Sequence, residues 1–158
     1  MTKNKEVTCK DVENMLYNYN TLRAQVVDIE LDIQSLKNEY MGLTGAGWND
    51  IKPTSPTYAV ASTVEAEIVN KDSRIEKLNK VKTNKEIEVK RVENMLTILR
   101  EDERELVELK YFKKIRAKMI AYKMNLCEEA IRKNNALILS SLANFLNQKL
   151  GKSWEKVG

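Results

Sequence analysis

The sequence predicts an all-α protein: a long antiparallel helical hairpin of coiled-coil character, followed by a three-helix helix-turn-helix domain. Two long stretches each carry a stripe of apolar residues at helical spacing. In the first stretch the steps alternate between three and four from Tyr19 onward, the heptad pattern of helices that pack against helices, whereas the second stripe weakens between Lys82 and Glu88. The 158 residues include only five Gly and two Pro, and 32% are charged. This composition is typical of long, solvated helices rather than sheets.

The first long helix is expected within residues 1–41, beginning near Thr8. Thr8 can cap the helix, and Asp11 follows three residues later, as in a capping box with Asp in place of Glu. The apolar residues form a narrow stripe, so we expect this helix to lie along another helix. The stripe consists of Val12, Leu16, Tyr19, Leu22, Val26, Ile29, Ile33, Leu36 and Tyr40.

A loop is predicted over residues 42–62, which hold three of the five Gly and both Pro. Trp48 in this loop is expected either to pack onto the helices or to dock to a partner. The second long helix is predicted over residues 63–99, with Ser62 or Thr63 as its cap. Its apolar positions are Val64, Ile68, Ile75, Leu78, Val81, Val89, Val92, Leu96 and Leu99. The two helices pair with each other in a hairpin, or each pairs with its copy in a homodimer.

Residues 100–148 are predicted to form the helix-turn-helix domain, and residues 149–158 a frayed tail. A short helix follows Arg100, and two more are expected at 117–124 and 128–147. Between these two, Asn125 is one of the few residue types other than Gly that tolerates a left-handed backbone. The other template positions are the small contact residue Ala121, the apolar residues Ile120, Met124, Leu126 and Ile131, and the cap Cys127.

The charge of the chain is unevenly placed. The total is +4, but the residues from Leu109 to the end carry eleven Lys or Arg against three acidic residues. A basic C-terminal part behind a weakly acidic N-terminal part indicates a polyanion as partner. The alternative is a basic surface that has no partner.

In a helix-turn-helix the second helix enters the major groove of double-stranded DNA. The exposed candidates for base contacts are Glu128, Glu129, Arg132 and Lys133. Arg132 can read a guanine through paired hydrogen bonds, Lys133 a phosphate or guanine, and either Glu a cytosine amine. The alternative is a solvated helix face on which each Glu pairs with the cation four residues later. Candidates for phosphate contacts are Lys110, Lys113, Lys114, Arg116, Lys118 and Lys123.

Catalytic, metal and cofactor sites are not expected. The chain has no His, which removes the commonest general base and metal ligand. Cys9 and Cys127 lie far apart, so neither a disulfide framework nor a zinc site is indicated. No glycine-rich phosphate loop is present. Without an apolar run that spans a membrane or a secretory signal, the chain is expected in the cytoplasm.

Two segments, LTILREDERELVELKYF and IAYKMNLCEEAIRKNNALILSSLANFL, resemble the fourth region of bacterial sigma factors. The full layout resembles more closely the small phage regulators of the ArpU and RinA type. This resemblance implies activation of phage late genes through binding of promoter DNA. The chain departs from the family at Ile115 and Arg116, where a Ser-Trp pair is common, and at Cys127, where Ser or Thr is usual. No region for melting the promoter is recognisable, which favours an activator over a sigma factor.

Two other functions remain open. The first is an adaptor that docks on RNA polymerase or another protein and binds DNA only weakly. The second is a small phage packaging subunit, in which the helix-turn-helix usually precedes the long helices rather than following them. A homodimer through the long helices is compatible with DNA binding, because one helix-turn-helix seldom supplies enough contacts alone.

Overall fold

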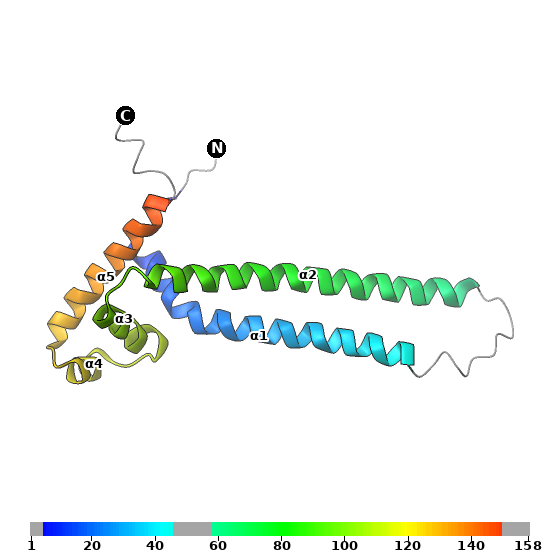
Figure 1. Ribbon diagram of the computed structural model, residues 1–158, viewed down its shortest axis with the longest axis horizontal. Helices are drawn as coiled ribbons and strands as arrows, with labels where there is room; N and C mark the ends of the chain where they lie inside the picture. Colours follow the sequence, from blue (N-terminus) through cyan, green and yellow to red (C-terminus); the bar gives the residue numbers. More distant parts are fainter. Residues whose placement is uncertain (1–4, 46–57, 150–158) are drawn as a thin grey trace, which may run out of the picture. The chain divides into compact units, whose positions relative to one another are not determined.

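The computed structural model describes residues 5–45 and 58–149 of the chain. Within these ranges all regular secondary structure is helical, which confirms the predicted all-α class. The helices, drawn in Figure 1, are α1 (Cys9–Gly45), α2 (Tyr58–Leu96), α3 (Glu101–Val107), the π-helical η1 (Glu108–Phe112), α4 (Ala117–Met124) and α5 (Glu128–Lys149). None of these helices is long and apolar enough to cross a membrane.

The chain packs as two compact units. The core unit comprises Met1–Leu22 and Glu88–Gly158, and the hairpin unit comprises Arg23–Ile87. The core unit therefore draws on residues far outside the range 100–148 predicted for the helix-turn-helix domain.

Helix α1 begins with reciprocal capping. The backbone N–H and the hydroxyl of Thr8 each donate to Asp11 Oδ2 at 3.0 Å, and the N–H of Asp11 donates to Thr8 Oγ1 at 3.3 Å. These bonds satisfy donors that a helix N-terminus otherwise leaves unpaired. The hydrogen bond from the Thr8 backbone is also the main reason that the pKa of Asp11 lies below its ordinary value. The predicted cap is confirmed.

The hairpin unit is an antiparallel helix pair (Figure 1). Lys85 Nζ donates to Gln25 Oε1 at 2.8 Å, and Lys82 Nζ lies 3.7 Å from Glu30 Oε1. Rising residue numbers in α1 thus meet falling numbers in α2. The predicted antiparallel arrangement of the two long helices is confirmed here.

The apolar seam of the hairpin unit is thin. Ile33 and Leu36 are its only buried hydrophobic residues among the side chains that the structure describes. Val64 and Val81, predicted to face the seam, are 42% and 45% exposed, and Tyr40 lies outside the described side chains. The half-buried members of the predicted stripes are Val26, Ile29, Ile68, Ile75 and Leu78. Two helices cover each other along one side only, so most of their surface stays solvated.

The core unit contains the main hydrophobic core. It is formed by the first turns of α1, the last turns of α2, and the helices from α3 to α5. Its fully buried members include Val12, Leu16, Val92, Met95, Leu106, Val107, Tyr111, Ile120, Ile131, Ile138 and Leu142. Burying one such aliphatic side chain contributes about 1.5–3 kcal/mol. Helices α4 and α5 are therefore stabilised by packing against the ends of both long helices.

A buried polar pair lies inside this core. The Tyr111 hydroxyl donates to Asn135 Oδ1 at 2.9 Å and lies 3.4 Å from Glu13 Oε1. Asn135 is only 7% exposed, and it is the one buried polar residue in the described part of the chain. Because buried polar groups are costly without partners, this bond fixes how η1 and α5 meet. Burial raises the pKa of Tyr111 well above its usual range.

The segment before α1 is held against α5 by one side-chain amide. Asn147 Oδ1 accepts from the N–H of Val7 at 2.8 Å, and Asn147 Nδ2 donates to the carbonyl of Val7 at 3.0 Å. This paired contact resembles one rung of a β-ladder. It connects residues 140 positions apart in the sequence.

The bounds of the long helices differ from the predicted ones. Helix α1 continues to Gly45, and α2 begins at Tyr58 and ends at Leu96. The predicted loop over 42–62 is therefore too long at both ends, and Ser62 and Thr63 lie inside α2 rather than capping it. A single Gly in a helix costs only about 1 kcal/mol relative to Ala, which does not suffice to stop α1. Trp48 lies outside the described residues.

Candidate nucleic-acid interface

A short turn over residues 125–127 joins α4 to α5 (Figure 1). Asn125 has φ 54° and ψ 41°, the left-handed conformation. The next N–H, of Leu126, donates to the carbonyl of Ala121 at 2.9 Å. A left-handed residue together with this six-to-one hydrogen bond ends α4 as a Schellman motif. The predicted backbone of Asn125 is confirmed, and Ala121 is buried, at 6% exposure.

Cys127 begins α5. The N–H of Ala130 donates to Cys127 Sγ at 3.4 Å, and the N–H of Ile131 donates to the Cys127 carbonyl at 3.1 Å. Sulfur is a weak acceptor, so this cap is weaker than one made by Ser or Thr. Leu126, expected to close the small core, is 42% exposed and that prediction is wrong. Because it lies in the turn, Leu126 has neighbours on fewer sides than the helical residue Ile120, which is fully buried.

The four residues predicted to contact bases occupy the exposed side of the first two turns of α5. Arg132 Nη2 lies 3.9 Å from Glu128 Oε2, and Lys133 Nζ lies 3.4 Å from Glu129 Oε1. The two basic side chains remain 75% and 74% exposed. Each Glu thus pairs with the cation four residues later, as in the alternative of a solvated helix face, and base contacts by these residues stay a prediction.

The residues predicted to contact phosphates lie before α4 and along it. Lys110 is half-buried in η1, and its Nζ lies 5.4 Å from the centre of the Tyr111 ring. Lys113 Nζ lies 3.6 Å from Glu108 Oε1. Lys118 and Lys123 are exposed on α4. The side chains of Lys118 and Lys123 therefore extend into solvent, whereas the ammonium group of Lys110 lies near the Tyr111 ring.

Lys114 and Arg116 shape the connection between η1 and α4. Lys114 has φ 54°, a left-handed conformation that is unusual for a long side chain. The N–H of Ile115 donates back to the carbonyl of Leu109 at 2.9 Å, which closes the end of η1. The Arg116 carbonyl accepts from the N–H of Ile120 at 3.1 Å at the start of α4. Both basic side chains are exposed.

Tyr122 is a candidate contact residue that the sequence pattern did not reveal. Its side chain is 80% exposed on α4, four residues after Lys118 and directly before Lys123. Tyrosine hydroxyls are among the groups that donate to DNA phosphates. The signal available in the sequence is helical spacing: once Ile120 and Ala121 face the core, Tyr122 must face away from it.

The local charge suits a polyanion. Between Leu109 and Lys149 the chain carries nine Lys or Arg against two Glu. Six of these nine cations lie before α4 or on it, and two more lie on the exposed side of α5. Attraction to phosphates by such a cluster is the sequence-independent part of DNA binding.

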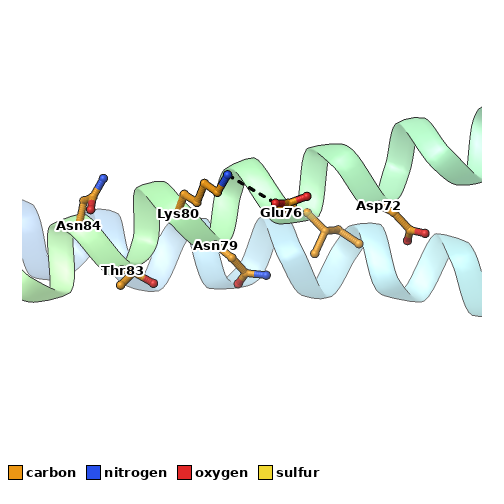
Figure 2. A pocket seen from close by; sticks show the side chains of 7 residues that line it. Asp72, Glu76, Asn79, Lys80, Thr83 and Asn84 are labelled. Atoms are coloured by element: carbon orange, nitrogen blue, oxygen red, sulfur yellow. Dashed lines mark ion pairs between the residues drawn. The ribbon is translucent and has the colours of Figure 1, made fainter.

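A shallow hollow in the hairpin unit is lined by residues of α2 alone (Figure 2). Its Glu76 and Lys80 pair at 3.4 Å and are both about 70% exposed in the side chain, so their charges are solvated rather than aimed at a bound group. The described part of the chain contains no group of three or more His, Cys, Asp or Glu that could hold a metal ion.

Comparison with known proteins gives no match: neither a family model, nor a curated protein, nor a solved structure is similar to the chain.

Proposed function

We propose that this protein binds double-stranded DNA through the α4–α5 helix-turn-helix and regulates transcription in a sequence-specific manner. The observation that carries the proposal is the left-handed turn at Asn125. It joins a basic first helix to a second helix whose exposed first turns carry Arg132 and Lys133. In this geometry the second helix reads bases, and the first contacts the backbone.

The ion pairs on α5 do not prevent base contacts. An exposed i,i+4 pair is worth about 0.3–0.5 kcal/mol, and the 3.9 Å separation of Arg132 and Glu128 places their pair at the weak end. A bidentate Arg–guanine contact is worth about 1–3 kcal/mol of discrimination. Since the guanine contact is worth more than the exposed ion pair, Arg132 exchanges its carboxylate partner for a guanine.

The two glutamates give the surface selectivity. Glu128 and Glu129 lie in the first turn of α5, where a helix N-terminus favours negative charge. Facing DNA, a carboxylate accepts a hydrogen bond from a cytosine amine but is repelled by phosphates. They therefore lower binding to unmatched sequences more than binding to a matched one.

We further propose phage late genes as the regulated genes, because the C-terminal segments resemble the fourth region of sigma factors. In this role RNA polymerase is a second partner. The helices predicted for the sigma-like part, 117–124 and 128–147, correspond closely to α4 and α5. That agreement supports the layout on which the resemblance depends.

The first experiment is selection of bound sequences from a random duplex pool by the purified full chain at near-physiological salt. We expect an enriched motif. Binding that is steeply salt-dependent but enriches no motif would reduce the proposal to phosphate contacts alone. Absence of any binding would overturn it and favour the polymerase-docking adaptor.

Point variants then test the assigned surface on the selected site. Arg132→Ala should weaken binding by about 1–3 kcal/mol and relax the preference at one base pair. Lys133→Ala has a matched control in Lys80→Ala, because both lysines pair at 3.4 Å with a Glu four residues earlier and have side chains 74% exposed. The control should leave affinity unchanged. Equal losses in both lysine variants would show that only total charge matters.

A further inference from the structure

The outer side of α1 in the hairpin unit carries an uncharged stripe with two large apolar residues. Val27 and Leu31 are each 56% exposed. With the exposed residues Ala24, Gln34 and Asn38 they form what we call the outer stripe. Its steps of three, four, three and four follow the heptad spacing of a helix that packs against another helix.

The outer stripe is distinct from the seam that α1 makes with α2. At 100° per residue, Val27 and Leu31 lie roughly half a turn around the helix from Ile33 and Leu36. Those two seam residues are 5% and 8% exposed. Helix α1 therefore has two heptad stripes, of which α2 covers one.

Helix α2 shows what a solvated outer side looks like in the same unit. Val69 is 65% exposed, but its side of α2 continues through Glu76 and Lys80, which pair at 3.4 Å. Charges at these positions keep a helix surface in water. No charged residue interrupts the outer stripe of α1 between Ala24 and Asn38. A run of five uncharged heptad positions is suited to packing against a helix.

We propose that the outer stripe binds a second copy of this chain, with the two α1 helices parallel and in register. In that pairing Val27 and Leu31 each meet the same residue of the other copy. Gln34 and Asn38 do so as well, and a side-chain amide can both donate to and accept from its twin. A polar Asn at a core position of a coiled coil is a known means of fixing register and a two-stranded state.

The flanking charges select a parallel pair. In parallel register Arg23 lies beside Asp28 of the other copy, and this attraction occurs twice by symmetry. The antiparallel pairing that matches Val27 with Leu31 instead sets Asp28 against Asp28 and Glu30 against Glu30. Like charges placed opposite each other oppose association.

Sedimentation equilibrium of the full chain over a range of micromolar concentrations tests the association. The wild type should show a reversible monomer–dimer equilibrium. Leu31→Glu should shift its dissociation constant upward at least tenfold, whereas Val69→Glu, at a comparably exposed position on α2, should not. Circular dichroism should show equal helicity in both variants. A wild type that stays monomeric throughout, or equal effects of the two variants, overturns the proposal.

Orientation is tested separately by cross-linking. With Cys9 and Cys127 replaced by Ser, Leu31→Cys should form a disulfide-linked dimer under mild oxidation, because a parallel pair brings this position to its twin. Val69→Cys should not form one. Failure of Leu31→Cys to cross-link, with dimer still present by sedimentation, overturns the parallel register.

The proposal does not rest on DNA binding, because association is measured on the protein alone. A dimer would carry two α5 helices, which matches a DNA site with two half-sites. A chain that dimerises without binding DNA leaves this inference intact, and one that binds DNA as a monomer leaves the proposed function intact.

Discussion

The two units use the same kind of helix in different ways. In the core unit 17 hydrophobic residues are buried together: sixteen come from the six helices, and Leu99 comes from the turn between α2 and α3. In the hairpin unit the described side chains include two buried hydrophobic residues, Ile33 and Leu36. A helix surrounded by others buries apolar residues on several sides, whereas a helix in a pair buries one stripe. The difference indicates that most of the stability resides in the core unit and that the hairpin unit leaves most of its surface in solvent.

The largest expected effect is in the core unit. Leu142 of α5 is fully buried, so Leu142→Ala removes its contacts and leaves a cavity. We expect a loss of about 2–5 kcal/mol in the free energy of unfolding, measured by urea denaturation. Leu137→Ala on the same helix is the matched control, because Leu137 is 67% exposed. Its effect should stay within about 0.5 kcal/mol. Similar losses in both would contradict the assignment of the core.

The buried polar pair gives the next largest effect. Tyr111→Phe leaves Asn135 Oδ1, now 2.9 Å from the Tyr111 hydroxyl, without this partner inside the core. The expected loss is about 1–3 kcal/mol, from the same denaturation measurement. Adding Asn135→Leu to Tyr111→Phe should recover part of the loss, because no polar group is then left unpaired. A double variant no more stable than Tyr111→Phe alone would mean that the unpaired Asn135 is not the source of the effect.

The same phenol gives the core unit a dependence on alkaline pH. Burial raises the pKa of Tyr111 in the folded state. Below about pH 10 both states keep the proton, so the contribution is constant. Above that pH the unfolded chain releases the proton while the folded chain retains it, so the free energy of unfolding falls as the pH rises. Tyr111→Phe should show a smaller fall than the wild type, and an equal fall would exclude Tyr111 as its cause.

The hairpin unit should respond less to the loss of a large side chain. Leu36 is 8% exposed at a seam that only two helices form. Because such a site can partly collapse, Leu36→Ala should destabilise the unit by about 2 kcal/mol, the low end of the range for buried Leu. Amide hydrogen exchange should also be faster in residues 23–39 and 64–87 than in α5. Slower exchange in the hairpin unit than in α5 would mean that the hairpin unit, and not the core unit, is the more stable of the two.

The sequence predicts the parts that depend on local chemistry. The Thr8–Asp11 cap, the left-handed Asn125 and the starts of α4 and α5 all follow from residue type and short-range spacing. The predicted seam is also confirmed at Ile33 and Leu36. These features are set by residues no more than a few positions apart, where helical periodicity and capping preferences are informative.

The features that escape prediction depend on tertiary packing. Lys114 adopts φ 54° although Lys has no preference for that conformation. The neighbouring π-helical turn at Glu108–Phe112 likewise has no sequence signal. Tyr111 and Asn135, 24 residues apart, meet only because η1 and α5 pack together. For the candidate site, sequence spacing identified the exposed side of α5, but the exposure of Leu126 depends on what surrounds the turn.

The smallest expected effect tests whether polar contacts hold the hairpin unit together. Lys82 Nζ lies 3.7 Å from Glu30 Oε1 and 3.9 Å from Glu86 Oε1, with 51% and 40% of the two Glu side chains exposed. Solvent screens such pairs, and Lys82 keeps a second carboxylate if the first is lost. Glu30→Gln should therefore change the unfolding free energy by no more than about 0.5 kcal/mol, measured at low and high salt. A loss as large as that of Leu36→Ala would mean that the thin seam is not what joins α1 to α2, and that the hairpin is held by its ion pairs instead.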